Sequence, residues 1–185
     1  MNSLAQTAAV RGDITAKFYN QDTLTRLEKF YNRQILKFRK AYPAIMKFYR
    51  LGKLKQIDEH KNVICVNGFN AVMRRLSGDT TYTGTINKML LGTGVTTAAA
   101  ADTQLATEAY RNAVASATAV DNVAYITAYF SETECSGTYK EFGNVIDGTA
   151  SANTGRLWSH LAGLNWVKDA STVLVVSCKY TGVSV

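Results

Sequence analysis

The side chains whose types could support catalysis lie in the second half of the chain. Ser159 directly precedes His160, and a nucleophile and base could also be drawn from His160 with Cys135 or Cys178. None of these arrangements has the strained elbow of a G-x-S-x-G motif, and adjacent residues of a strand point to opposite faces. The sequence therefore predicts a protein that is not an enzyme.

A small group of carboxylates surrounds Cys135 and consists of Glu132, Glu134 and Glu141. A catalytic carboxylate pair needs one carboxyl whose pKa is raised by an apolar pocket. Residues 136–137 indicate a turn, so we expect solvent-facing carboxylates here. The three cysteines are widely spaced and the chain has two histidines, so neither a metal site nor a cofactor is predicted.

Gly92 and Gly94 are the two glycines of a Gly-Thr-Gly segment that superficially suggests a phosphate-binding loop. The segment lacks the lysine of the P-loop and the third glycine of the dinucleotide-binding motif. Glycine instead supplies backbone freedom where a Cβ atom would clash. We therefore expect a structural turn at Gly92 and Gly94, followed by a short helical turn that Asp102 caps.

Positive charge is concentrated in one segment of the chain. Residues 26–55 carry ten lysines and arginines and one acidic residue, whereas the remainder carries 11 basic and 13 acidic residues. Aromatic side chains alternate with the basic ones. The residues expected to form a partner-docking surface are Arg26, Lys29, Phe30, Tyr31, Arg33, Lys37, Phe38, Arg39, Lys40, Phe48, Tyr49 and Arg50.

Three interpretations of this basic-aromatic segment remain open. It could dock on an acidic protein surface, where charge steers association and aromatic side chains anchor it. It could be an amphipathic helix with solvated lysines, or it could bind nucleic acid through phosphate contacts and base stacking. Protein docking is favoured over nucleic acid. A membrane surface is not expected, because the apolar stripe is modest and Pro43 interrupts it.

The elements that would carry these residues begin with a helical arm. Residues 1–20 are small and polar and are expected to be extended. Apolar residues three or four apart predict a helix over residues 21–42, and these are Leu24, Leu27, Tyr31, Ile35 and Phe38. Pro43 breaks that helix, and a second helix is expected over residues 44–54. Residues 1–57 are therefore predicted to form a basic-aromatic helical arm.

Residues 58–185 are expected to form a β-rich body that opens with a short helix at about residues 63–77. Alternating apolar residues and turn signals predict strands at 85–91, 109–120, 123–130, 139–146, 156–167 and 171–180. Strands at this spacing favour an antiparallel β-sandwich or a jelly-roll-like body. The fold class is therefore predicted as α+β, with Trp158 and Trp166 as core or interface anchors.

A set of motifs in residues 62–185 resembles a pattern of small virion proteins of tailed bacteriophages. The pattern combines a helix that ends in a small residue, an LGTG run, a D-T-x-L-x-x-E-x-x-R run and a later turn. The matching residues here are Gly68-Phe69, Leu76-Ser77-Gly78, Leu91-Gly92-Thr93-Gly94, Asp102-Thr103, Leu105, Glu108, Arg111, Glu141-Phe142-Gly143 and Arg156-Leu157.

This resemblance implies a structural part of a virion, synthesised in the host cytoplasm. Its partners would be other virion structural proteins, and the chain is expected to form a homo-oligomer. Tail, baseplate or fibre attachment is the favoured position, and capsid decoration or neck is the alternative. A nucleic-acid-binding protein that uses the basic segment is the second alternative from the residues themselves.

Overall fold

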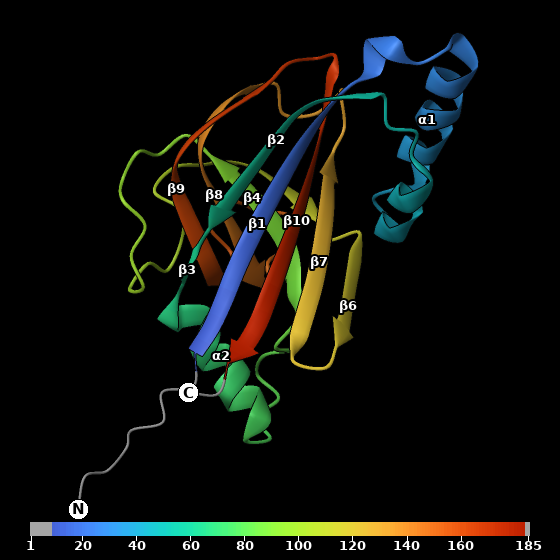
Figure 1. The fold of residues 1–185 in the computed structure, drawn as a ribbon. Helices are drawn as coiled ribbons and strands as arrows, with labels where there is room; N and C mark the ends of the chain where they lie inside the picture. The colour runs from blue at the N-terminus through green and yellow to red at the C-terminus, as the bar shows by residue number, and fades with distance from the viewer. Residues whose placement is uncertain (1–8, 184–185) are drawn as a thin grey trace, which may run out of the picture.

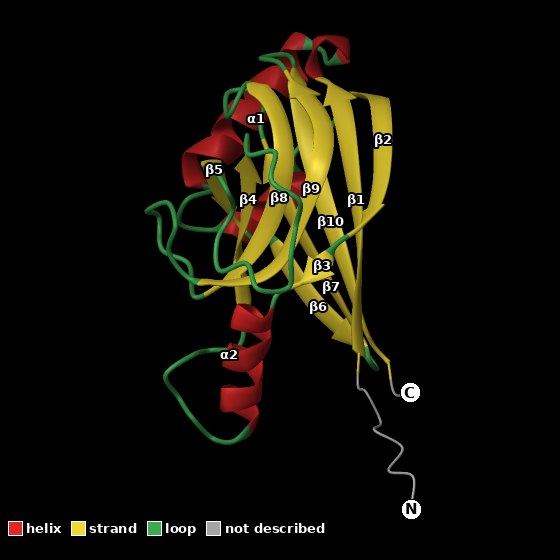
Figure 2. Ribbon diagram, turned by 90° about the vertical axis from the view of Figure 1, so that its left-hand side faces the viewer, coloured by secondary structure: helices red, strands yellow, loops and turns green. Residues whose placement is uncertain are grey.

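The computed structural model describes residues 9–183, which fold into two antiparallel five-stranded sheets packed face to face (Figures 1 and 2). Sheet 1 has the order β2 (Lys53–Lys61), β1 (Ala9–Asn20), β10 (Thr172–Val183), β7 (Val123–Phe130) and β6 (Ser116–Val120). Sheet 2 has the order β3 (Val63–Ile64), β9 (Arg156–Lys168), β8 (Gly137–Ile146), β4 (Ile86–Gly92) and β5 (Glu108–Ala113). The protein is therefore mostly β, and the predicted β-sandwich is confirmed.

The described residues also contain two short α-helices at opposite ends of the sandwich (Figure 1). Helix α1 (Arg26–Phe38) lies between two 3₁₀ turns, η1 (Gln21–Thr23) and η2 (Pro43–Phe48). Helix α2 (Val66–Leu76) packs on β9 at the other end. The structure has no α-helix where one was predicted for residues 44–54. That stretch contains most of the 3₁₀ turn η2 and, from Lys53, the start of strand β2.

The prediction of a helical N-terminal arm is wrong for its first part, because the described N-terminus is a strand. Strand β1 lies between β10 and β2 in sheet 1 and pairs with both along most of its length. Ile14, Ala16 and Phe18 alternate toward the core and are almost fully buried. The boundary expected between residues 57 and 58 falls inside β2. We use the name helical segment for residues 21–48, which contain η1, α1 and η2.

The core lies between the two sheets and is rich in aromatic side chains. The ring of Trp166 lies 6.2 Å from that of Phe18 and 5.7 Å from that of Phe142, measured between centroids. Trp158 is also buried, so both tryptophans are core residues as expected. Burial of such large side chains supplies most of the driving force for closing the two sheets.

Strand β10 explains why one central segment of the sequence is apolar on both faces. Leu174 and Val176 point into the main core, whereas Val173 and Val175 belong to a second cluster with Ile35 of α1. The helical segment therefore covers part of the outer surface of sheet 1. A segment predicted as one strand, residues 109–120, is divided into β5 and β6, which belong to different sheets.

Candidate docking surface

Helix α1 begins where its sequence supplies both halves of a capping box. The Oγ1 of Thr25 accepts a hydrogen bond from the Glu28 N–H at 3.3 Å, and a Glu28 carboxylate oxygen accepts from the Thr25 N–H at 3.0 Å. These bonds satisfy donors that a helix start would otherwise leave free. Pro43 starts η2, so the chain turns there and folds back beside α1.

One face of α1 and its C-cap pack on the protein's own sandwich through Ile35 and Arg39, and the buried Asn32 bonds to the chain that leads into β2. The Asn32 side-chain amide donates to the Arg50 carbonyl at 2.9 Å and accepts from the Arg50 N–H at 2.8 Å. Ile35 contacts the second core cluster, which includes Met46. These contacts attach one side of the helical segment to sheet 1.

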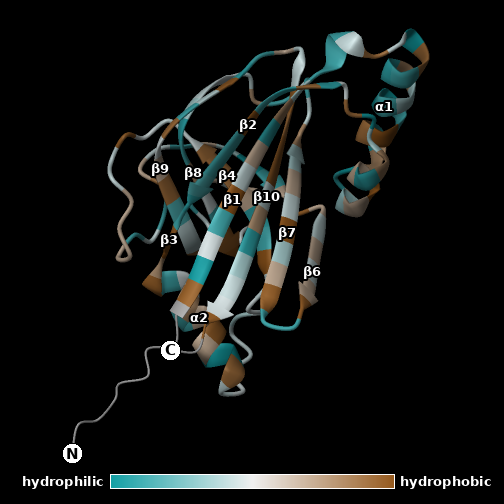
Figure 3. Cartoon of the chain, viewed as in Figure 1, coloured by the Kyte–Doolittle hydropathy of each residue, from teal (hydrophilic) through white to brown (hydrophobic). Residues whose placement is uncertain are grey.

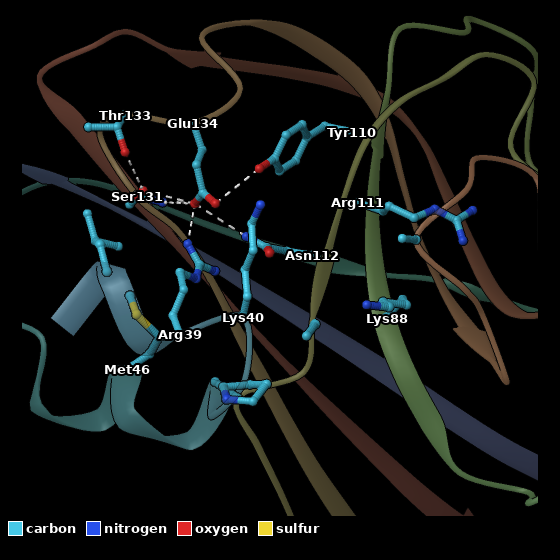
Figure 4. Close-up of a pocket in the computed structure, with 15 residues that line it drawn as sticks. Arg39, Lys40, Met46, Lys88, Tyr110, Arg111, Asn112, Ser131, Thr133 and Glu134 are labelled. Atoms are coloured by element: carbon cyan, nitrogen blue, oxygen red, sulfur yellow. Dashed lines mark hydrogen bonds and ion pairs between the residues drawn. The ribbon is translucent and has the colours of Figure 1, made fainter.

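Arg39 ties the end of α1 to the loop that follows β7 (Figure 4). Its guanidinium pairs with the Glu134 carboxylate and donates a second hydrogen bond to the Tyr129 carbonyl at 2.7 Å. Glu134 also accepts from the Ser131 N–H at 2.8 Å and from the Tyr110 hydroxyl at 3.0 Å. Burial alone would raise the pKa of Glu134, but Arg39 and the Ser131 bonds hold that pKa below its usual value.

Tyr49 makes a second link, because its hydroxyl donates to the Glu132 carboxylate. Burial and this hydrogen bond raise the pKa of Tyr49, so the phenol stays protonated and remains a donor. Arg39 and Tyr49 were both expected to face a partner. They contact the protein's own sandwich instead, and the carboxylates that receive them are two of the three expected to face solvent.

Another face of α1 exposes large apolar side chains. In Figure 3 the α1 ribbon alternates between hydrophobic (brown) and hydrophilic (teal) residues. Leu27 is 77% exposed and Phe38 is 55% exposed, and Phe30 and Tyr31 lie between them on the same stripe. The spacings of three, four, seven and eleven residues place all four on one helical face. We call these four side chains the outer face of α1.

Two further aromatics extend the apolar surface beyond the helix. Tyr42, which follows α1, is 68% exposed, and Phe48 in η2 is 54% exposed. The Lys47 ammonium lies 4.9 Å from the Phe48 ring centroid, and the Arg50 guanidinium lies 5.8 Å from that of Tyr31. Basic groups therefore stand beside the exposed rings as well as between them in the sequence.

The remaining predicted residues form a basic stripe beside the outer face. Arg26, Arg33, Lys37 and Lys40 are exposed, and Lys29 is half-buried and pairs with Asp22 at 3.5 Å. On the helical circumference these five residues lie between the outer face and the packed face. Of the twelve residues predicted for docking, the structure thus places all but Arg39 and Tyr49 at least partly in solvent.

No protein-family model, no curated protein and no solved structure matches the chain. The resemblance to small virion proteins of tailed phages therefore remains a sequence-based prediction.

The Gly92–Gly94 turn is organised by the carboxylate of Glu141, which was expected to face solvent and is buried. Glu141 is fully buried and accepts hydrogen bonds from the N–H groups of Gly94 at 2.9 Å and Thr107 at 2.7 Å. A Cβ atom on Gly94 would lie 2.4 Å from the Glu141 Oε1. Neither Gly92 nor Gly94 has a positive φ. The glycines are therefore needed because the carboxylate approaches closely, not because of their backbone conformation.

His160 closes the same network from β9. Its Nδ1 lies 2.6 Å from an Asp102 carboxylate oxygen, and its Nε2 lies 3.0 Å from one of Glu141. The imidazole ring therefore bridges the two carboxylates, one at each ring nitrogen. The helical turn predicted at Asp102 is absent, and that carboxylate instead joins the long loop after β4 to β9.

The nucleophiles that could have used His160 lie elsewhere. The Ser159 Oγ is within 2.8 Å of the Tyr180 hydroxyl on the other face of β9. Burial raises the pKa of Cys178 to about 12 and that of Cys135 to about 11, so both remain thiols at neutral pH. Among the described residues, the hydrogen-bond partners of the His160 ring are the carboxylates of Asp102 and Glu141, not any of these three groups.

Between residues 9 and 183, no three histidine, cysteine or acidic side chains gather in a way that could hold a metal ion. None of the helices there combines the length and the hydropathy needed to cross a membrane.

Proposed function

We propose that this protein is a structural component of a tailed-phage virion that docks on neighbouring virion proteins through the outer face of α1. The observation that carries the proposal is the two-sided character of this helix. One side is packed and hydrogen-bonded to the sandwich, and the other holds Leu27, Phe30, Tyr31 and Phe38 in solvent. The resemblance in residues 62–185 supplies the virion context.

The outer face has the composition of an interface centre. Exposed aromatic side chains on a rigid element lose little conformational entropy on binding and bury a large area. Aromatic and arginine residues are also the ones that contribute most to binding free energy. A merely solvated helix would carry polar residues at Leu27 and Phe38, where this chain has two of its largest exposed apolar groups.

The basic stripe indicates the charge of the partner. Residues 26–55 carry an excess of nine positive charges. Such a concentration favours encounter with an acidic surface and disfavours a basic one. We therefore infer that the partner is a protein with acidic residues around an apolar patch. Tail, baseplate or fibre attachment remains the favoured position, and capsid decoration or neck remains the alternative.

A second candidate function is nucleic-acid binding by the same surface. The observation that favours it is the placement of exposed arginines and lysines beside exposed rings, such as Arg50 beside Tyr31. Phosphate contacts and base stacking would use the same groups. This candidate predicts a steep dependence of affinity on salt, which an aromatic-anchored protein interface does not share.

Mass spectrometry of intact particles tests the proposal. We expect the chain to be present in purified particles in a fixed ratio to the other virion proteins. We also expect the isolated chain to pass through a column of immobilised double-stranded DNA at physiological salt. Absence of the chain from purified particles would refute the structural role, and retention on DNA would favour the second candidate.

A further inference from the structure

A cavity of about 420 Å³ lies between the helical segment and the edge of sheet 2 that carries β4 and β5 (Figure 4). Its walls come from the end of α1, from η2, from β4 and β5, and from the loop after β7. This size is within the range of pockets that hold small organic ligands. The cavity lies behind the packed side of α1, so it is separate from the outer face.

Two of the charged pairs at this cavity are internally neutralised. Arg39 is paired with Glu134, as described above. Arg111 donates to both carboxylate oxygens of Glu108, at 2.5 and 2.6 Å, and its guanidinium also donates to the Thr154 hydroxyl at 2.9 Å. Each cation therefore has its own anion, and neither pair leaves net charge in the cavity.

Two lysines in the wall are not neutralised. Lys40 lines the cavity from the end of α1, and Lys88 lines it from β4 (Figure 4). Among the described residues neither ammonium has an ion-pair or hydrogen-bond partner. Lys88 is half-buried, so its charge is only partly solvated, whereas Lys40 is exposed. The cavity thus has an excess of two positive charges that an anion could neutralise.

The rest of the wall is mixed, with polar groups from Asn112, Ser131 and Thr133 beside a set of apolar side chains. Leu36, Pro43 and Met46 come from the helical segment, and Ala113 and Ala115 come from the end of β5 and the residues that follow it. A bare inorganic anion would leave these apolar side chains in contact with water. A ligand with an apolar body and one anionic group would bury the wall and neutralise the lysines together.

We propose that this cavity binds an organic anion, a carboxylate or phosphate group carried on an aromatic or aliphatic body, with Lys40 and Lys88 as its cationic contacts. The same chemistry could come from a free phosphate ester or from an acidic side chain of a bound protein. The site does not depend on docking through the outer face of α1.

Titration of the isolated protein, followed by NMR, tests this site with defined probes. The probes are phenyl phosphate, inorganic phosphate, uncharged benzyl alcohol and a blocked phenylalanyl-aspartate dipeptide. We expect phenyl phosphate or the dipeptide to saturate the site and to shift the Met46 methyl signal, because Met46 is buried in its wall. Inorganic phosphate and benzyl alcohol should bind at least about tenfold more weakly. Inorganic phosphate has no apolar body, and benzyl alcohol has no negative charge. Tighter binding of the dipeptide would assign the site to a protein-borne carboxylate, and tighter binding of phenyl phosphate to a free ester.

Matched lysine variants distinguish a built site from general attraction of anions. Lys88→Gln should weaken binding of the tighter probe about tenfold, because it removes one charge-assisted contact. Lys37→Gln removes the same charge from an exposed position of α1 that does not line the cavity, and it should leave the affinity unchanged. Equal effects of the two variants, or no saturable binding of either organic anion, would overturn the proposal. Unchanged melting temperatures establish that both variants remain folded.

Discussion

Arg39 and Glu134 form an ion pair that joins the helical segment to the sandwich across 95 residues of sequence. Both side chains are largely buried, and the guanidinium also holds the Tyr129 carbonyl. The pair fixes the end of α1, and with it the direction in which Phe38 projects. It therefore ties the end of α1, next to Phe38 of the outer face, to the sandwich.

Removing one partner of this ion pair should destabilise the folded protein. Arg39→Met leaves a largely buried carboxylate without its cation, and we expect a loss of about 3 kcal/mol in the free energy of unfolding. The double variant with Glu134→Met should recover part of that loss, because no uncompensated charge remains. Urea unfolding measures both, with Lys37→Met as an exposed control on the same helix. An unchanged midpoint for Arg39→Met would contradict this account.

The same pair predicts a loss of stability in acid. The folded-state pKa of Glu134 lies below its ordinary value, so ionised Glu134 stabilises the fold above about pH 4.3, its usual unfolded pKa. That contribution is lost as the pH falls through the folded pKa. Glu134→Gln should therefore be less stable at pH 7 and show a shallower decline below about pH 4.

The exposed Glu59 of β2 provides the control for this pH series. Glu59→Gln should follow the wild-type curve of unfolding free energy against pH. A Glu134→Gln curve parallel to that of the wild type would mean that the pair contributes nothing to the acid response.

The turn at Gly94 should not tolerate a side chain. A Cβ there would lie 2.4 Å from Glu141 Oε1 and 2.6 Å from the Ala106 Cβ. We expect Gly94→Ala to destabilise the protein by about 1–3 kcal/mol through this overlap. Gly137→Ala is the matched control, because its Cβ would meet nothing closer than 3.5 Å. Equal melting temperatures for the two variants would show that the Glu141 network is loose.

Strand β1 makes the N-terminal region an internal part of sheet 1. It lies between β10 and β2, and Ile14 and Phe18 are each only 1% exposed. A chain that starts at residue 58 loses the neighbour of β10 and part of the core. We expect it to lack the β-sheet circular dichroism of the full chain. A soluble fragment with that signal intact would show that residues 58–185 form a separable body.

The sequence predicted most of sheet 2 and the C-terminal strands because their pattern is local. Alternating apolar residues between turn signals located β7 to its exact bounds as residues 123–130, and β8, β9 and β10 to within a few residues. Strand β1 was missed as part of the sandwich because its buried side chains are few and one is Ala16. Its position depends on pairing with β10, about 160 residues away in sequence, which no local pattern reports.

The sequence predicted the exposed residues of the candidate site but not the buried carboxylates beside it, for a similar reason. Helical periodicity located the exposed aromatics of α1, because amphipathic spacing is visible in the sequence. Burial of Glu134 and Glu141 was not visible, since each depends on donors that are distant in sequence, such as Arg39 and Gly94. Charged residues beside a turn are usually solvated, and only the tertiary structure shows that these two are enclosed.

Incorporation of neighbouring α1 variants into particles tests the central claim most directly. Phe38→Ala removes an aromatic of the outer face, whereas Lys37→Ala removes an adjacent exposed charge. Quantitative mass spectrometry of particles assembled with each variant, over a series of salt concentrations, should show at least about tenfold fewer copies for Phe38→Ala and less than about threefold fewer for Lys37→Ala. Docking on protein would be contradicted by two results together. These are a larger loss of copies for Lys37→Ala than for Phe38→Ala, and retention of the wild-type chain on DNA that falls steeply as salt rises.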